Sequence, residues 1–191
     1  MGVEHVVYEA DRWGVGELVV ENDRVVWHEL PWPRPRPLPA GSSAPGRGIA
    51  PDRFRTPTHP GYREVVSRQP SQCGGGFATD VVRLVQAFLA GTAPPDALVE
   101  VPVDLEYGTP FLSDCAAALR AVPGGEVVTY GELAALAGAP GAARAAGSFC
   151  ARNRLGLFVP CHRVVSASGL GSYGSFGVAY KRRLLELEGA L

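Results

Sequence analysis

The chain has 191 residues, a formal net charge of −1 and 46% hydrophobic side chains. This content supports a folded core with one large or two small domains, and the charge argues against a uniformly basic nucleic-acid-binding protein. The sequence contains no run of 18 apolar residues, and its start lacks the charged and apolar regions of a signal peptide. We therefore expect a cytoplasmic protein without a membrane segment.

Alternating apolar residues near the N-terminus predict an antiparallel meander, with strands over 5–8, 16–20 and 25–27. The dipeptide Asn22-Asp23 supplies the turn between the last two strands.

The region after the meander changes in composition. Nine of the seventeen prolines lie in residues 31–60, which predicts a long loop, partly in the polyproline II conformation. Helical apolar spacing over 79–89 predicts a helix that Gly91 ends, and residues 97–103 predict another strand. We expect a first domain over residues 1–105.

The second half of the sequence contains residues that typically begin and end helices. Thr109-Pro110 begins a helix that ends at Pro123, with Cys115 as a core residue. After a short strand over 126–128, a capping box of Thr129 and Glu132 begins the next helix.

A third helix is predicted to begin at Pro140, after a turn of about three residues, which is the spacing of a helix-turn-helix. Its residues 142–148 are small except for Arg144, so the helix offers little to read base edges but permits close approach to a minor groove. Close helix packing through the alanines is the structural alternative.

Charge is segregated towards the C-terminus, which argues for a surface facing a polyanion. Residues 137–191 carry seven basic side chains against two acidic ones, a net +5. A solvated face without a ligand is the alternative. The basic residues are Arg144, Arg152, Arg154, Arg163, Lys181, Arg182 and Arg183.

The most informative segment places Cys161 beside His162 and Arg163, after an apolar run over 157–159 that predicts a buried strand. Neighbouring cationic or proton-accepting groups lower the pKa of a thiol and so favour the nucleophilic thiolate. In an extended chain Cys161 and His162 would point to opposite faces, so a partnership requires a bend or a bridging water. The four cysteines form no CxxC pair and the histidines no metal-ligand spacing, so we predict reduced thiols, no metal and no cofactor.

Together these features resemble the O6-alkylguanine-DNA alkyltransferase family, whose members move an alkyl group irreversibly from DNA to one of their own cysteines. The resemblance covers residues 108–188. Its matching segments are Gly108-Thr109-Pro110-Phe111, Thr129 to Ala134, Ala142 to Gly147, Asn153, Pro160 to Val164 and Lys181 through Glu188.

The resemblance implies an α+β fold of two domains. Residues 1–105 would form a variable, ribonuclease H-like domain with an antiparallel sheet and a helix. Residues 106–191 would form a helical, winged-helix-like catalytic domain with the helix-turn-helix. The implied activity is direct-reversal repair of double-stranded DNA containing O6-alkylguanine, and also O4-alkylthymine, by a monomer that acts once.

The resemblance also implies roles in the chemistry. Cys161 would accept the alkyl group, His162 would take its proton through a water, and Glu188 would orient His162. Asn153 would hydrogen-bond near the thiolate, and the backbone carbonyls of Cys161 and Val164 would accept from the guanine amine.

Further implied roles concern DNA. Tyr130 would crowd the phosphate and donate its hydroxyl to N3 of the flipped guanine, and Arg144 would fill the gap in the base stack. Ala143 and Gly147 would allow the helix backbone to approach the DNA.

The sequence departs from the family at two places. In the loop that covers the lesion, the family usually has the order Gly-Tyr, whereas this chain has Tyr173-Gly174. We therefore expect Tyr173 and Phe176 to share the role of pocket wall. Arg154 and Gly156 stand in a stretch where the family often has prolines.

Two other functions are alternatives to alkyl transfer. A non-transferring sensor of alkyl lesions would lack the cysteine, so Cys161 argues against it. A cysteine hydrolase using Cys161 and His162 would leave the helix-turn-helix without a purpose.

Overall fold

The computed structural model describes residues 2–32 and 76–191. The proline-rich loop predicted over 31–60 lies outside these residues, except that Pro31 and Trp32 belong to a strand and not to the loop.

The predicted meander is present as a sheet in the order β1-β2-β3, with all pairs antiparallel. Its strands are β1 (Val3–Ala10), β2 (Gly14–Glu21) and β3 (Arg24–Trp32). Asn22 and Asp23 both adopt positive φ, at 51° and 55°, which is the left-handed pair that a tight hairpin turn requires. Sequence alternation and turn chemistry therefore fix this sheet locally.

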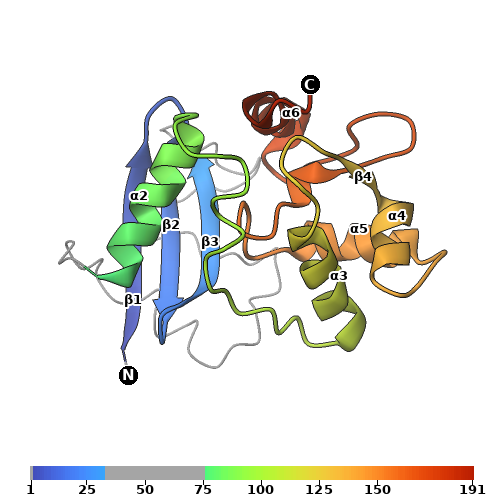
Figure 1. Cartoon of the computed structure of the whole chain (residues 1–191), viewed down its shortest axis with the longest axis horizontal. Coiled ribbons are helices and arrows are strands. Elements are labelled where there is room, and N and C mark those ends of the chain that lie inside the picture. The colour runs from blue at the N-terminus through green and yellow to red at the C-terminus, as the bar shows by residue number, and fades with distance from the viewer. Residues whose placement is uncertain (1, 33–75) are drawn as a thin grey trace, which may run out of the picture.

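Helix α2 (Phe77–Leu89) lies across one face of the sheet, as Figure 1 shows. Its apolar stripe is buried and includes Val81, Val85 and Phe88, which confirms the predicted helix. The strand predicted over 97–103 is wrong, because this segment forms turns and makes a single bridge between Val103 and Val25.

The C-terminal half contains four helices and two short strands among the described residues. They are α3 (Pro110–Arg120), β4 (Val128–Thr129), α4 (Tyr130–Leu136), α5 (Ala143–Arg152), the 3-10 turn η1 (Cys161–Arg163), β5 (Val164–Val165) and α6 (Gly177–Glu188). Strands β4 and β5 are parallel, so they bring the start of α4 beside the residues that follow Cys161.

Caps set the helix boundaries as predicted. The Thr109 side chain accepts from the Leu112 amide at the start of α3, and Thr129 and Glu132 form the capping box of α4. The helix-turn-helix is present, but its turn is longer than predicted. Helix α5 begins at Ala143 and not at Pro140, because Gly138 and Gly141 both have positive φ and interrupt the helix.

The apolar run over 157–159 is buried, but it is a turn and not the predicted strand. Leu157 has φ +73°, and the Val159 amide donates to the Leu155 carbonyl at 2.8 Å. The chain then enters η1, which supplies the bend that Cys161 and His162 require.

One hydrophobic core spans both halves and includes Leu18, Val85, Leu119, Phe158 and Leu184. Within residues 2–32 and 76–191, no helix is long and apolar enough to cross a membrane.

Candidate active site

Cys161 begins η1 and is partly buried. Burial raises the pKa of its thiol, whereas the polar side chains of Asn153 and Tyr173 and the charge of Lys181 act in the opposite direction. The predicted lowering of the thiol pKa is therefore wrong for the free protein, because desolvation outweighs the polar neighbours. Ionisation needs a group that accepts the proton.

The geometry of His162, the chain neighbour of Cys161, defines its tautomer. Its side chain is buried, and Nε2 lies 2.9 Å from Oε1 of Glu188. The carboxylate can only accept, so Nε2 carries the hydrogen and Nδ1 presents a lone pair. Nδ1 has no hydrogen-bond partner among the described residues. Burial also lowers the pKa of His162, which keeps the imidazole neutral and able to take a proton.

Glu188 is held by two partners. Burial would raise its pKa, but hydrogen bonds and charges from His162 and Arg163 lower that pKa to about 2. Arg163 Nε donates to Oε2 at 3.0 Å and Nη2 donates to Oε1 at 2.9 Å. The expected proximity of Glu188 to His162 is present.

Arg163 is only 1% exposed, so it does not contribute to a DNA-facing surface. Beyond Glu188, its guanidinium donates to the Val122 carbonyl at 2.6 Å, the Pro95 carbonyl at 3.0 Å and Oδ1 of Asp96 at 3.1 Å. A buried guanidinium needs such a full set of acceptors, and here they anchor η1 beneath the catalytic pair.

Asn153 closes the turn that leads to Cys161. Its Nδ2 donates to the Val159 carbonyl at 2.7 Å, and its Oδ1 accepts from the Leu155 amide at 3.1 Å. Tyr107 donates its hydroxyl to the same Oδ1 at 2.7 Å. The amide is thus oriented by three bonds, with its NH2 group on the side of the sulfur.

Tyr130 begins α4 and lies between α5 and the loop over 169–177. A side-chain atom added at Gly147 would lie 3.8 Å from the Tyr130 ring, and one added at Gly171 would lie 3.4 Å from its hydroxyl. Burial raises the pKa of Tyr130, whereas a hydrogen bond with Ser172 lowers it. Helix α5 and the loop therefore meet at the Tyr130 side chain, with α5 against its ring and the loop against its hydroxyl.

Tyr173 is 8% exposed and packs inwards, stacked on Tyr180 at 6.1 Å between ring centroids. Phe176 stacks on Trp32 of β3 at 4.3 Å, which ties the loop to the sheet. Gly174 is exposed with φ +47°, a conformation that suits glycine. Burial raises the pKa of Tyr173 well above its ordinary value, and its hydroxyl has no hydrogen-bond partner among the described residues.

Lys181 is a site residue that the sequence reasoning assigned to the basic surface. It is fully buried, and its Nζ donates to the carbonyls of Val164 and Leu170. Its ammonium thus fixes both ends of the segment after η1, and it occupies the Val164 carbonyl that was expected to face guanine. The spacing of residues 181, 184, 185 and 188 on one face of α6 is a signal that could have revealed its burial.

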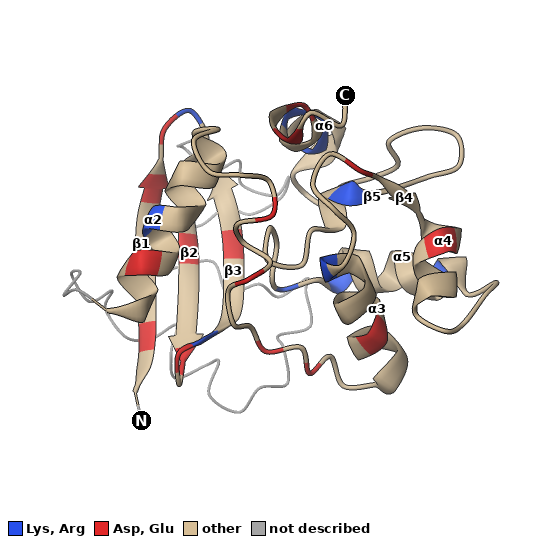
Figure 2. Ribbon diagram, in the orientation of Figure 1, with Lys and Arg blue, Asp and Glu red and all other residues tan. Residues whose placement is uncertain are grey.

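Arg144 is exposed on α5, and its side chain has no ion pair or hydrogen bond with any residue in the described part of the chain. Ala143 and Gly147 share this helix and are partly buried. The predicted basic surface is smaller than expected, because Arg163 and Lys181 are interior and Arg154 pairs with Asp104 at 2.7 Å. Figure 2 shows acidic residues on the strands of the sheet and also on α3, α4 and α6, and basic residues on α6, near β5 and on α2.

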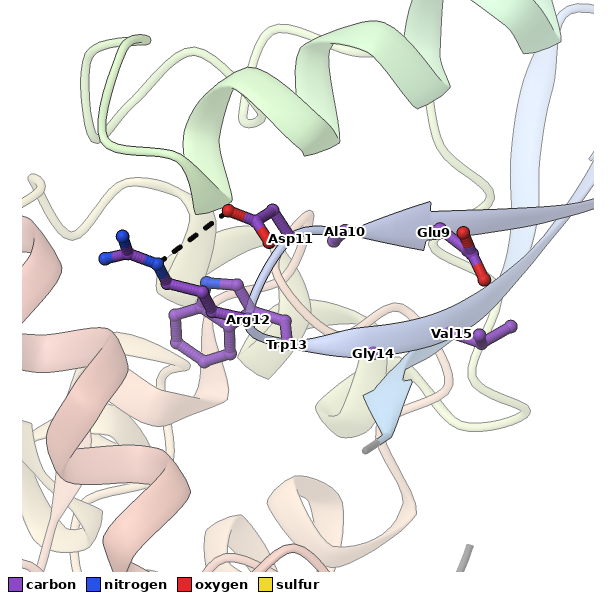
Figure 3. A pocket seen from close by; sticks show the side chains of 7 residues that line it. All are labelled: Glu9, Ala10, Asp11, Arg12, Trp13, Gly14 and Val15. Carbon is purple, nitrogen blue, oxygen red and sulfur yellow. Dashed lines mark ion pairs between the residues drawn. The ribbon is translucent and has the colours of Figure 1, made fainter. Parts of the chain in front are cut away.

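A separate hollow lies at the tip of the β1-β2 hairpin and involves none of the predicted site residues (Figure 3). Its ion pair joins the exposed Asp11 and Arg12 at 3.8 Å. Trp13 donates to the Leu89 carbonyl at 2.8 Å and carries Arg183 over its ring at 3.7 Å. These contacts fix the hairpin to α2 and α6. In residues 2–32 and 76–191, no group of three potential ligands could hold a metal ion.

Comparisons with known proteins agree with this geometry. Residues 110–190 match the family model described as 6-O-methylguanine DNA methyltransferase, DNA binding domain. The chain is 44% identical over 127 residues to the methylated-DNA–protein-cysteine methyltransferase of Mycobacterium leprae, covering 63% of this chain and 73% of the relative. The corresponding protein of Salmonella typhimurium is 39% identical over 133 residues, covering 70% and 71%.

The structure is similar to that of Mycobacterium tuberculosis OGT in complex with DNA. The TM-score is 0.68 at 29% identity, and the match covers 98% of this chain and 93% of the solved chain.

Proposed function

The chain belongs to the methylated-DNA–protein-cysteine methyltransferase family, and we propose that it repairs O6-alkylguanine in double-stranded DNA by moving the alkyl group to Cys161. The observation that carries this assignment is the buried His162–Glu188 pair, in which Nδ1 of the residue that follows Cys161 has no hydrogen-bond partner among the described residues. The proposal includes O4-alkylthymine as a second substrate, and a monomer that acts in the cytoplasm.

In the proposed reaction, the Cys161 sulfur forms a bond to the alkyl carbon as the bond from that carbon to O6 breaks. His162 Nδ1 accepts the thiol proton through a water, while the Tyr130 hydroxyl gives a proton to the departing guanine. The tyrosine recovers its proton from the imidazolium by way of water. Thiol and O6-alkylguanine thus become thioether and guanine.

The remaining predicted residues would act on binding. Asn153 and Tyr173 would stabilise the thiolate, and Gly174 would allow the loop to fold over the base. Arg144 would enter the base stack, with Ala143 and Gly147 bringing α5 close to the minor groove. The carbonyls of Cys161 and Val164 would receive the guanine amine. The Val164 carbonyl has a second lone pair for this purpose beside its bond from Lys181.

The domain division belongs to the same proposal. Residues 1–105 would be a ribonuclease H-like support, and residues 106–191 a winged-helix-like DNA-binding unit that carries the nucleophile.

The test is transfer by Cys161→Ser, with Cys150→Ser as the matched control. We expect the first variant to bind O6-methylguanine duplex without reacting, because a serine hydroxyl is not ionised near neutral pH. Cys150 lies near the site, but burial strongly raises the pKa of its thiol, so its variant should react as the parent does. DNA binding by the parent protein without any transfer would instead favour the sensor function.

A further inference from the structure

The outer edge of strand β3 is bonded to the turn that leads to Cys161. The His28 amide donates to the Arg154 carbonyl at 2.8 Å, and His28 forms a parallel bridge with Leu155. The Arg154 guanidinium returns to the sheet, where Nε donates to the Val26 carbonyl at 3.1 Å. These contacts attach the turn to the N-terminal sheet. Arg154 and Val26 are 128 residues apart in the sequence.

The His28 side chain continues this attachment inside the protein. It is 4% exposed, with Nδ1 2.5 Å from the Gly156 carbonyl oxygen and Nε2 2.5 Å from the Tyr8 hydroxyl. Because a carbonyl can only accept, Nδ1 carries the hydrogen and Tyr8 donates to Nε2. The neutral ring is fully satisfied, and it packs edge-on against Phe158 at 5.1 Å.

The turn depends on contacts of this kind because it has no regular backbone ladder. Gly156 is buried, and a Cβ there would lie 3.2 Å from Leu30, so the chain passes close against the sheet. Leu157 follows in a left-handed conformation that is unfavourable for leucine, and such a residue persists only where its surroundings hold it. The Gly156 carbonyl belongs to the peptide plane directly before Leu157, so a bond to that oxygen fixes the plane.

The same turn sets the position of the sulfur. Asn153 bonds to the Val159 carbonyl at 2.7 Å, and the Cys161 amide donates to that carbonyl at 2.8 Å. Arg120 donates to the Phe158 carbonyl at 3.1 Å from the opposite side. A shift of the Gly156–Val159 backbone would therefore move both the Asn153 amide and Cys161.

We propose that His28, supported by Tyr8, is a positioning residue for alkyl transfer, which holds the Gly156 peptide so that Asn153 and Cys161 keep their reactive geometry. The N-terminal sheet then sets the reactivity of a thiol in the other half of the chain. The assignment of the reaction itself rests on the proposed function. A buried histidine that serves only the core would affect stability and leave the reactivity of the folded protein unchanged.

The test compares His28→Leu, which removes the bond to Gly156, with His28→Gln, whose amide can donate to a carbonyl and accept from a hydroxyl. His5→Leu is the matched control, because His5 lies in the same sheet and pairs with Glu17 at 3.2 Å away from the turn. Each folded variant is reacted across a range of pH with O6-benzylguanine free base and, separately, with iodoacetamide. Alkylation is counted on the peptide that contains Cys161.

For His28→Leu we expect both reactions to slow by about tenfold, the effect of one ordinary hydrogen bond, with the pH midpoint of the rate moved upward. His28→Gln should recover most of the rate, and His5→Leu should react as the parent does. If His28→Leu does not fold, Tyr8→Phe removes one hydroxyl only and should give a smaller shift in the same direction. Parent rates and pH midpoints in every folded variant would overturn the positioning role.

The two reagents separate this role from the proposed function. Iodoacetamide reports on the thiolate without needing guanine recognition. A parent protein that is inert to O6-benzylguanine, with His28→Leu still slowing iodoacetamide, would reject the function and retain the positioning role. A parent protein that reacts with O6-benzylguanine, together with variants that keep the parent rates and pH midpoints, would retain the proposed function and reject the positioning role.

Discussion

Cys161 combines a nucleophilic atom with surroundings that favour its neutral form. Burial raises the pKa of the thiol in the free protein, so the cysteine is protected from ionising in the absence of a substrate. Burial lowers the pKa of His162 and keeps its ring neutral, and Glu188 holds the ring through Nε2. In the proposed reaction, activation of the thiol would therefore depend on this carboxylate, which lies in the last turn of α6.

Replacement of Glu188 by Gln tests this dependence. The carboxylate raises the affinity of His162 for a proton, so its loss should slow transfer and move the rate–pH profile to higher pH. It also leaves the buried charge of Arg163 with the exposed Asp96 as its remaining counter-ion, which should lower the free energy of unfolding by about 3 kcal/mol. Transfer rates across pH and urea unfolding at pH 7.5 measure the two effects.

Glu186→Gln is the control, because Glu186 is exposed on the same helix and should change neither quantity. A folded Glu188→Gln protein with the parent rate and pH profile would place Glu188 outside the reaction.

Buried histidines predict the response of stability to acid. Burial lowers the pKa of His28 to about 4, against about 6.5 in the unfolded chain, and burial lowers that of His162 as well. Below pH 6.5 the unfolded chain binds protons that the folded chain excludes, so stability is complete above that pH and falls as the solution is acidified. His28 alone should account for a loss of about 3 kcal/mol by pH 4.

Glu188 affects the stability of the fold at lower pH than His28 does. Its pKa of about 2 lies below the usual value of 4.5, so its contribution is present above pH 4.5 and is lost as the pH falls towards 2. Urea unfolding measured at intervals from pH 7.5 to pH 4 should show a shallower decline for His28→Gln than for the parent protein. Equal slopes in the two proteins would contradict the buried neutral state of His28.

At the residue scale, the sequence was informative where chemistry is local to the chain. The pair of Cys161 and His162 is adjacent, and the resemblance placed Glu188 and Asn153. Arg163 and Lys181 were misread as surface charges, because the carbonyls and carboxylate that allow their burial come from distant parts of the sequence. His28 offered no signal, since its partners lie in β1 and in the turn after α5.

At the scale of elements, α4, α5 and the loop over 169–177 meet around the Tyr130 side chain. Helix α5 presents small residues and the exposed cation of Arg144 to the solvent. This arrangement suits a helix that approaches a minor groove and inserts a single side chain into the duplex.

Arg144→Ala should therefore impair repair of O6-methylguanine in duplex DNA far more than reaction with O6-benzylguanine free base. The free base leaves no vacancy in a base stack, so the lost side chain has nothing to fill. Rates on the two substrates, with DNA affinity measured over a range of salt, test the prediction.

Arg83→Ala is the control, because Arg83 is exposed on α2 over the sheet and pairs with Asp80. Equal losses on duplex and free base would place Arg144 in the chemical step or in folding. An affinity that does not change with salt would contradict a footprint of arginines on phosphates.

Element prediction succeeded where short-range signals agree. The meander, α2, α3 and the capping box of α4 combine apolar periodicity with turn or cap residues. The strands predicted over 97–103 and 157–159 were wrong, because a short buried apolar run does not distinguish a strand from a turn. The boundary at Pro140 was wrong because the positive φ of Gly141 arises only in the folded turn.

At the scale of the whole molecule, the N-terminal sheet makes direct contacts with the C-terminal half. The edge of β3 bridges to Val103 and Leu155, and Trp32 stacks on Phe176 of the loop over the site. The sheet thus contacts both segments that flank the nucleophile (Figure 1). The antiparallel sheet and the order of the helices could be predicted from the sequence, whereas this joining of the two halves rests on contacts between residues far apart in the chain.

The stoichiometry of repair tests the central claim most directly. The protein is incubated with an excess of O6-methylguanine duplex, its intact mass is measured, and the repaired guanines are counted. We expect each chain to gain the mass of one CH2 group, located on Cys161, with repair that stops at one lesion per chain because a thioether is not hydrolysed. Repair beyond one lesion per chain, or a methyl group on any other residue, would contradict the assignment of Cys161 as the irreversible acceptor.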